Sequence, residues 1–369
     1  MKATQQLQNA GQSLWLDNIS RGMLDDGTLH RYIADLSVTG LTSNPTIFEH
    51  ALAKGNFYDD AIREKSNEGM SGESLFFDLA LEDLRRAAEL FHPTHERTSG
   101  VDGWVSLEVS PLLANDAAGT IAAAAELHRR AARPNLFIKI PGTPAGIVAI
   151  EESIANGVPV NVTLLFSAAQ YVAAANAHLR GIERRVAAGL DPHVGSVASL
   201  FVSRWDVAVA DKVPSALHNK LGIAVAQSTY REYRRLLSSP RWIALAAVGV
   251  QAQRLLFAST GTKDPKASDT LYVEALAAPD TVNTIPEKTL IAFADHGRVS
   301  GAMLPDGGNA ELTLTSFRQA GIDVDALGEQ LQREGAASFD KSWNALLVQL
   351  ATKQEALVSH LSALAGKDR

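Results

Sequence analysis

The hydrophobic and polar positions along the chain follow two alternating patterns. Short apolar runs rich in β-branched residues are separated by longer stretches in which apolar residues recur every three or four positions. The short runs predict strands, and the longer stretches predict helices. Each of these helices is long enough to return the chain for a further parallel strand. The pattern therefore predicts βα units around a parallel sheet.

Eight strands are predicted, the number that a (β/α)8 or TIM barrel needs. The strands cover residues 13–19, 37–42, 104–109, 136–140, 159–164, 198–201, 255–259 and 271–274. Helices are predicted at residues 74–91, 117–132, 145–156, 167–188, 205–220 and 223–237. An open, doubly wound sheet is the alternative, but the first strand continues into DNISRG at 17–22 and not into a glycine-rich phosphate-binding motif. We predict an α/β fold, a TIM barrel with additional C-terminal helices.

The C-terminal part of the chain has a purely helical pattern after residue 294. Residues 295–306 form a polar, glycine-rich stretch that predicts a loop, and residues 336–365 predict a final pair of helices packed on the barrel. No low-complexity linker or internal repeat divides the chain. We predict a single domain over residues 1–369, in which the stretch from about 295 consists of helices packed on the barrel.

The composition is that of an ordinary globular protein and narrows the choice of partners. The chain has 369 residues, 46% of them hydrophobic, and a net charge of -7, so it lacks the basic surface that nucleic acids or anionic membranes require. It has no cysteine, which excludes disulfides and cysteine-based zinc or redox chemistry. The first residues, MKATQQL, lack the apolar core of a signal peptide, and no apolar run approaches membrane-spanning length. We expect a cytoplasmic protein.

One lysine stands inside an apolar, strand-forming run, NLFIKIPGT at 135–143. In a strand buried on both faces, the Lys139 amine has to be paired or to lose its proton. A neutral lysine amine is the form that attacks a ketone to make a Schiff base. The alternative is an edge strand from which the amine reaches solvent. The sequence around Lys139 is compatible with both arrangements.

Polar side chains recur where the predicted strands end, and in a TIM barrel this end carries the chemistry. The candidates are Asp17, Asn44, Glu108, Lys139, Asn161, Thr163, Ser199, Arg204 and Ser259. Each has an ordinary structural explanation: Asp17 and Asn44 suit helix caps or turns, and Glu108 suits an ion pair with a buried lysine. Their recurrence at the same end of consecutive strands predicts that they converge in one pocket.

Four motifs together resemble the transaldolase family. They are LTSNPTI at 41–47, SLEV at 106–109, LFIKIP at 136–141 and NVTLLFS at 161–167, and the likeness runs from about residue 14 to the end of the chain. The resemblance implies a TIM barrel related to class I aldolases, with the Schiff-base lysine on the fourth strand. It implies transfer of a dihydroxyacetone unit from sedoheptulose 7-phosphate or fructose 6-phosphate to glyceraldehyde 3-phosphate or erythrose 4-phosphate, in the non-oxidative pentose phosphate pathway. No metal or other cofactor is expected, because the imine is the electrophile.

The resemblance also implies a role for each candidate residue. Lys139 would form the imine with C2 of the ketose, and Asp17 would be the base that takes the proton of the C4 hydroxyl. Glu108 and Thr163 would hold a water for proton transfer during imine formation. The residues expected to bind the hydroxyls of the dihydroxyacetone unit are Asn44, Asn161 and Ser199.

The phosphate of the substrate is expected to bind Arg204 and Ser259. Many transaldolases carry Ser-x-Arg after the seventh strand, whereas this chain reads ASTGTK at 258–263. We expect Lys263 to take the place of the missing arginine, although a lysine lacks the bidentate fork of a guanidinium.

Two alternatives compete with a transaldolase. In related fructose 6-phosphate aldolases a tyrosine tends to stand at the position of Phe201 and a glutamine at that of Glu108, so Phe201 and Glu108 favour transfer over release. A non-catalytic sugar-phosphate-binding barrel would be expected to lack at least one of Lys139, Asp17 and Glu108, and all three are present. Alanine-rich stretches at 121–125 and 173–177 suit a homodimer interface, and close helix packing inside one chain explains them equally well.

Overall fold

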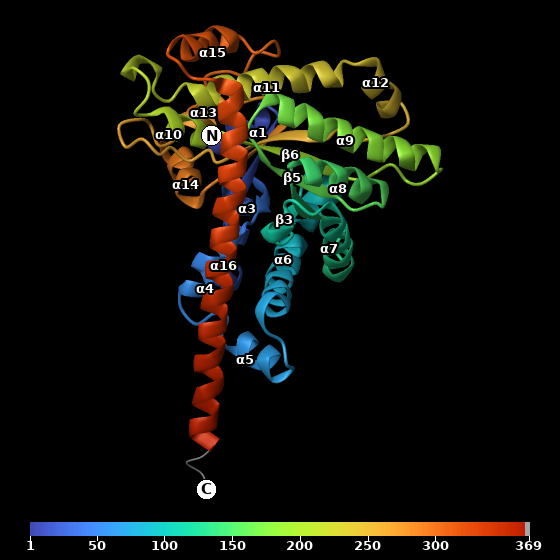
Figure 1. The fold of residues 1–369 in the computed structure, drawn as a ribbon, viewed down its shortest axis with the longest axis vertical. Helices are drawn as coiled ribbons and strands as arrows, with labels where there is room; N and C mark the ends of the chain where they lie inside the picture. The colour runs from blue at the N-terminus through green and yellow to red at the C-terminus, as the bar shows by residue number, and fades with distance from the viewer. Residues whose placement is uncertain (366–369) are drawn as a thin grey trace.

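Eight parallel strands form the centre of the protein, whose structure is a computed structural model that describes residues 1–365 (Figure 1). The strands are β1 (Gln12–Asp17), β2 (Val38–Thr42), β3 (Val105–Glu108), β4 (Leu136–Pro141), β5 (Val160–Leu165), β6 (Ser196–Phe201), β7 (Arg254–Ala258) and β8 (Thr281–Ile285). Their order is β2-β1-β8-β7-β6-β5-β4-β3, so β1, the first strand of the chain, lies beside β8, the last. This is the predicted (β/α)8 barrel.

The barrel closes between β2 and β3 through backbone hydrogen bonds outside the regular ladder. The Leu41 amide donates to Trp104 O at 2.9 Å, and the Gly103 amide donates to Thr39 O at 2.9 Å. Gly40 stands at this closure, where a Cβ atom would lie 2.7 Å from Trp104 O and 2.8 Å from the Trp15 ring. A side chain at position 40 would therefore push the two strands apart.

The helices surround the barrel and continue beyond it at the C-terminal end of the chain (Figure 1). They are α1 (Ala3–Asn9), α2 (Arg21–Asp25), α3 (Thr28–Asp35), α4 (Pro45–Ala53), α5 (Asp59–Asn67), α6 (Gly72–Arg97), α7 (Ala117–Ala131), α8 (Pro144–Ala155), α9 (Ala168–Ala187), α10 (Ser203–Val209), α11 (Leu221–Leu237), α12 (Pro240–Ala246), α13 (Leu271–Ala275), α14 (Glu287–His296), α15 (Ala310–Gln319) and α16 (Val324–Ala365), with short 3-10 turns at Pro111–Leu113 and Ser215–Leu217. Within residues 1–365, no helix has both the length and the apolar character needed to cross a membrane.

The eighth predicted strand was wrong. Residues 271–274 lie in the helix α13, and the eighth strand is β8, ten residues further along the chain. In α13 the buried side chains include Tyr272 and Val273, with Leu276 just after the helix, a spacing that suits one helical face. In β8 the adjacent residues Asn283 and Thr284 are both polar and buried, and they point to opposite faces of the strand. Thr284 contacts the Thr42 hydroxyl, and Asn283 accepts a hydrogen bond from the Thr260 hydroxyl. Hydrophobicity alone therefore selected the wrong segment.

Two helix predictions were also wrong. The helix predicted at 205–220 ends at Val209 as α10, and Pro214 then begins the turn at Ser215–Leu217. The helix pair predicted at 336–365 is a single helix, α16, which begins at Val324. No glycine or proline stands between residues 336 and 365, so nothing in the backbone interrupts that helix.

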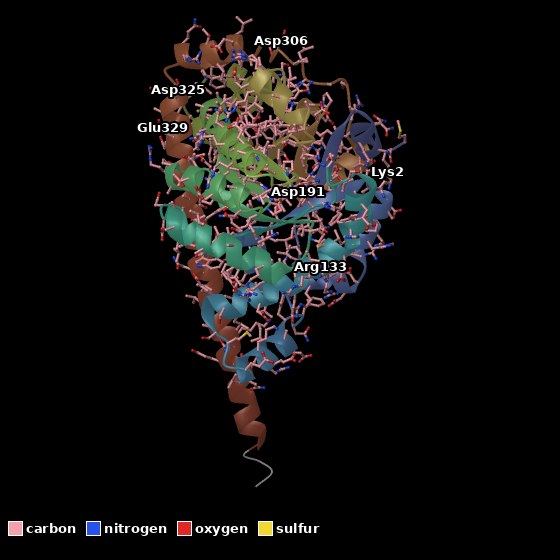
Figure 2. The ribbon with its side chains drawn as sticks, turned by 90° about the vertical axis from the view of Figure 1, so that its right-hand side faces the viewer. Lys2, Arg133, Asp191, Asp306, Asp325 and Glu329 are labelled. Carbon is pink, nitrogen blue, oxygen red and sulfur yellow. The ribbon has the colours of Figure 1, made fainter. Side chains whose placement is uncertain are left out.

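Helix α16 runs along one side of the barrel and extends past α4 and α5 (Figures 1 and 2). Its main anchor is Trp343, whose ring packs edge-on against Phe76 with ring centres 4.9 Å apart and whose Nε1 donates to Glu73 at 3.0 Å. Further along, Lys353 pairs with Asp59 at 2.8 Å. These contacts tie the end of the chain to α5 and α6, which lie early in the sequence.

The alanine-rich stretch at 173–177 lies in α9, which packs closely on α8 and α11. Ala174 and Ala177 are buried inside the chain, and a Cβ atom at Gly181 would lie 2.8 Å from Glu151 O. Small side chains are needed along this face of α9 because α8 approaches it closely. Internal packing therefore accounts for the buried alanines of this stretch.

Replacing Trp343 tests how strongly α16 is held. Trp343→Ala removes a fully buried ring and its hydrogen bond, so we expect the free energy of unfolding to fall by about 3–5 kcal/mol in denaturant titrations. Val348→Ala, on an exposed part of the same helix, is the matched control and should change this free energy by less than about 0.5 kcal/mol. Equal stability of Trp343→Ala and the wild type would contradict this account of α16.

Candidate active site

A cavity of about 160 Å³ lies at the C-terminal ends of the barrel strands. Its walls come from every strand except β3, from the loops that follow the strands, and from the helices α4, α10 and α16. Nine of the predicted residues line it: Asp17, Asn44, Lys139, Thr163, Ser199, Phe201, Arg204, Ser259 and Lys263. The predicted convergence of strand-end side chains is therefore present in the structure.

The two remaining predicted residues lie next to the cavity wall. Glu108 on β3 places its Oε2 atom 3.3 Å from Lys139 Nζ. Asn161 on β5 accepts a hydrogen bond from Ser199 Oγ at 2.7 Å and donates to Ser106 Oγ at 3.1 Å. Glu108 and Asn161 thus each contact a residue that lines the cavity.

Lys139 lies in the interior of the sheet, which excludes the edge-strand alternative. The strand β4 lies between β3 and β5, and Lys139 is in register with Glu108 and Asn161. The residue is only 4% exposed, and its Nζ atom donates to the Ser43 carbonyl at 3.0 Å. The carbonyl and the Glu108 carboxylate together compensate for the loss of water around the amine.

Asp17 is held by a short chain of hydroxyl groups. Thr42 donates to Asp17 Oδ1 at 2.8 Å, and the Thr42 and Thr284 hydroxyl oxygens are 2.7 Å apart. Burial raises the pKa of the Asp17 carboxyl, while the Lys139 charge, the Thr42 hydrogen bond and the Lys263 charge oppose this rise. Asp17 is therefore not a helix cap, a task that Ser20 performs for α2.

Glu108 and Thr163 combine burial with incomplete pairing. Burial raises the pKa of the Glu108 carboxyl; the Lys139 charge lowers it, and the charge of Asp17 adds to the rise. Thr163 Oγ1 is buried and makes no hydrogen bond within the described chain. A buried hydroxyl without a partner is costly unless a water or a ligand completes its hydrogen bonds.

Asn44 caps a helix and also lines the cavity. Its side-chain oxygen accepts a hydrogen bond from the Ile47 amide at 3.0 Å and so caps α4, with Pro45 as the first helical residue. Asn44 also lines the cavity. The capping interpretation and the functional interpretation are compatible, because the cap fixes the side chain at the cavity rim.

The other side of the cavity is cationic. The Arg204 guanidinium lies 5.5 Å from the Phe201 ring centre, and no carboxylate of residues 1–365 comes within salt-bridge distance of it. Burial lowers the pKa of Arg204, and the charge of Glu334 opposes this effect. Ser259 adopts a positive φ of 55° and places its Oγ atom 2.9 Å from Ser203 Oγ. A partly buried cation without a paired anion is well suited to bind an anionic group.

The sequence did not single out seven of the lining residues: Thr42, Thr46, Ala258, Gly261, Thr284, Pro286 and Phe339. Thr42 lies inside the LTSNPTI motif and could have been selected from it. Thr284 was missed because β8 was assigned to the wrong segment. Phe339 lies on α16, and its local sequence contains no signal that it reaches the barrel mouth.

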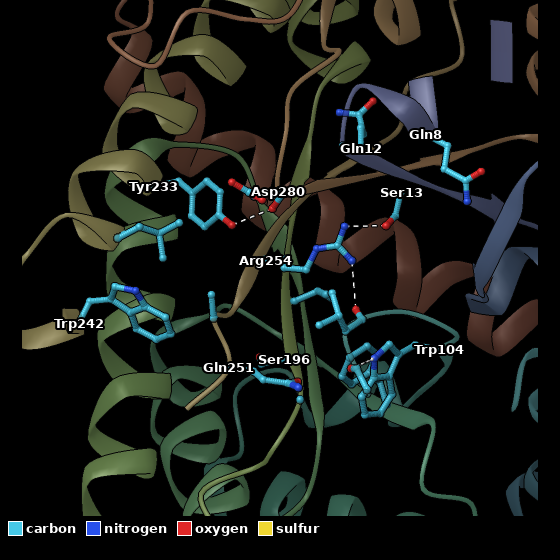
Figure 3. A pocket seen from close by; sticks show the side chains of 18 residues that line it. Gln8, Gln12, Ser13, Trp104, Ser196, Tyr233, Trp242, Gln251, Arg254 and Asp280 are labelled. Atoms are coloured by element: carbon cyan, nitrogen blue, oxygen red, sulfur yellow. Dashed lines mark hydrogen bonds between the residues drawn. The ribbon is translucent and has the colours of Figure 1, made fainter. Parts of the chain in front are cut away.

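A larger cavity, of about 470 Å³, lies at the opposite end of the barrel, where the strands begin (Figure 3). Arg254 stands in it and donates to Ser13 Oγ at 2.6 Å, with Tyr233, Trp242 and Trp104 around it. This cavity contains none of the predicted residues. Side chains at this end of a TIM barrel usually serve stability, so the smaller cavity at the C-terminal ends is the candidate active site.

Comparisons with known proteins agree with the fold and the motifs. Residues 14–350 match the family described as Transaldolase/Fructose-6-phosphate aldolase. A transaldolase of Thermobifida fusca is 45% identical over 94% of this chain and 97% of its own length, and one of Frankia alni is 44% identical over 94% and 96%. A transaldolase of Thiobacillus denitrificans is 42% identical over 95% of this chain and its own full length. The chain therefore belongs to the transaldolase/fructose-6-phosphate aldolase family of enzymes.

Proposed function

We propose that the protein is a transaldolase that acts through a Schiff base on Lys139. It transfers a dihydroxyacetone unit from sedoheptulose 7-phosphate or fructose 6-phosphate to glyceraldehyde 3-phosphate or erythrose 4-phosphate, in the non-oxidative pentose phosphate pathway of the cytoplasm. The observation that carries the proposal is the buried Lys139 amine, which faces a cavity that also holds Asp17 and an unpaired arginine. The relatives named transaldolase support the same activity.

Imine formation needs a neutral amine and a route for protons. The Lys139 amine attacks C2 of the ketose to form a carbinolamine, which then loses water to give the protonated imine. Glu108 lies 3.3 Å from the amine, and its raised pKa allows it to take up and return a proton. Thr163 Oγ1, which lacks a partner within the described chain, can hold the water that relays these protons.

Cleavage of the C3–C4 bond follows from the charge of the imine. Asp17 takes the proton of the C4 hydroxyl, the C4 carbonyl forms, and the electron pair of the breaking bond moves toward the positive imine nitrogen. The aldose phosphate leaves, and an enamine remains on Lys139. When the acceptor aldehyde arrives, the enamine carbon attacks it and Asp17 returns its proton to the new alkoxide. Water then adds to C2 of the product imine, and the C–N bond breaks to release the new ketose phosphate and the free Lys139 amine.

The remaining wall positions the substrate. Asn44, Asn161 and Ser199 suit the hydroxyls of the dihydroxyacetone unit, and the hydrogen bond from Ser199 to Asn161 fixes both side chains. Arg204, Ser259 and Lys263 suit the phosphate. Lys263 supplies a flexible point charge where many transaldolases have an arginine, so it contributes charge without bidentate geometry.

Transfer is favoured over simple release of dihydroxyacetone. The cavity wall carries the apolar ring of Phe201. Related fructose 6-phosphate aldolases tend to have a tyrosine at this position, and its hydroxyl could protonate the enamine. The enamine therefore persists until an acceptor binds. Because Phe339 of α16 lines the same cavity, we also propose that the barrel and the C-terminal helices form one domain.

Trapping the imine tests the central step. After borohydride reduction with fructose 6-phosphate, peptide mapping by mass spectrometry should find a reduced sugar or dihydroxyacetone adduct on Lys139. Lys139→Ala should lose this adduct and at least about 10⁴-fold in activity. Lys139→Met keeps the volume of the side chain and controls for collapse of the site. An adduct on another lysine, or near-normal turnover by either variant, would rule out this mechanism.

Removing the proposed base separates imine formation from cleavage. Asp17→Ala and Asp17→Asn keep Lys139, so the donor imine should form and accumulate as a six- or seven-carbon adduct after reduction. Transfer should fall by about 10²–10⁴-fold, the usual contribution of a positioned base. The ratio of donor adduct to dihydroxyacetone adduct in the mass spectrum is the measurement. Normal turnover would mean that the base is another residue.

The pH profile tests the hydroxyl chain around Asp17. The base form of Asp17 is present above its pKa, so the cleavage rate is lost as the pH falls through that value. Thr42→Val removes a hydrogen bond that lowers the pKa of Asp17, so the acid limb of the rate profile should move to higher pH. Thr39→Val is the matched control on the same strand, where the hydroxyl contacts only the Leu14 carbonyl and should leave the limb in place. A limb that does not move in Thr42→Val would contradict this assignment.

A further inference from the structure

Helix α16 supplies part of the active-site wall from outside the eight βα units. Gln332, Gly335, Phe339 and Trp343 are spaced three or four residues apart, so they share one face of the helix. Gln332 Nε2 donates to the carbonyls of Gly142 at 3.0 Å and Leu164 at 2.9 Å, at the ends of β4 and β5. This side chain attaches α16 to the two strands that carry Lys139 and Thr163.

A glycine allows the helix to come close to the cavity. A Cβ atom at Gly335 would lie 3.0 Å from the Leu164 side chain, which is tighter than ordinary contact, and 3.4 Å from Arg204 Nη1. One helical turn further on, Phe339 enters the cavity wall. The position of Phe339 is thus fixed from one side by Gln332 and Gly335 and from the other by the buried Trp343.

The Phe339 ring covers the reacting amine. Its centre lies 5.8 Å from Lys139 Nζ, 6.0 Å from the Arg204 guanidinium and 6.5 Å from the centre of the Phe201 ring. Phe339 is only 5% exposed, although it stands at the mouth of the barrel. Two phenyl rings, from β6 and from α16, therefore face the space around the amine, and neither can donate a proton from its ring.

We infer that Phe339 determines whether the dihydroxyacetone unit on Lys139 is passed to an acceptor or lost to water. The inference rests on the proposed function. Loss requires water twice: the enamine carbon takes a proton to give the protonated imine, and water then adds to C2, after which the C–N bond breaks and releases dihydroxyacetone and the free amine. An apolar ring that fills the space next to the amine keeps bulk water from the enamine carbon while the acceptor site is empty, whereas a water held by Thr163 serves the formation and hydrolysis of the imine. Phe339 is a specificity-determining residue of the transfer reaction.

The test compares release with transfer in the full-length protein. With fructose 6-phosphate alone, the released dihydroxyacetone is measured; with added erythrose 4-phosphate, the sedoheptulose 7-phosphate formed is measured. Phe339→Ala opens the wall, so the ratio of release to transfer should rise on the order of tenfold. Phe339→Leu keeps apolar bulk and should stay within about twofold of the wild-type ratio. Phe339→Val opens the wall less and serves if the alanine variant does not fold; its ratio should lie between the other two.

Leu346→Ala is the matched control. Leu346 is a fully buried residue of the same helix that does not line the cavity, so its truncation weakens the packing of α16 without opening the wall. Its ratio of release to transfer should equal that of the wild type even if both rates fall. A ratio that is unchanged in the Phe339→Ala and Phe339→Val variants, or that rises equally in Leu346→Ala, would overturn the inference. If the wild type forms no borohydride adduct, the proposed function itself fails and the inference fails with it. This outcome differs from an unchanged ratio in the Phe339 variants, which would overturn the inference alone.

Discussion

A lysine amine buried inside the barrel is the constraint on which the rest of the site depends. Lys139 stands on a central strand with almost no exposure, and a polar group in that position is costly unless other polar groups surround it. The Ser43 carbonyl and the Glu108 carboxylate meet this need directly. The neighbouring interior residues Asn161 and Ser199 are linked by a hydrogen bond of their own. The amine is thus one of several buried polar groups at this end of the barrel, and each of those named here has a polar partner.

The two carboxylates near Lys139 differ in what surrounds them. Asp17 is held by the hydroxyl of Thr42, which in turn contacts Thr284, and it faces the cavity. Glu108 lies behind the wall and contacts Lys139. Burial raises the pKa of both, but hydrogen bonding opposes the rise through different partners. Two carboxyl groups in unlike surroundings can take different parts in proton transfer, which suits a reaction with separate imine and cleavage steps.

The cavity wall joins residues from the first two strands with a residue of the last helix, α16. Asp17 and Asn44 come from the first two strands, whereas Phe339 comes from α16, which packs on α4, α5 and α6. The helix is attached to the ends of β4 and β5 through Gln332 and to α6 through Trp343. A wall built this way stays closed only while α16 remains packed on the barrel. The place of Phe339 in the cavity wall therefore depends on the contacts of α16 that flank it.

Seven of the strands and nine of the lining residues could be predicted from the sequence, because they follow local rules: apolar β-branched runs form buried strands, and polar residues at their ends converge in a barrel. The sequence by itself determined the family, the barrel and the position of Lys139 in it. Only the tertiary structure decided which segment is β8, since Asn283 and Thr284 are polar residues that are buried on opposite faces of the strand and carry no hydrophobic signal. It also decided that Phe339 covers the amine, because a contact between residues 200 positions apart depends on how a long helix packs and not on the residues beside it in the chain.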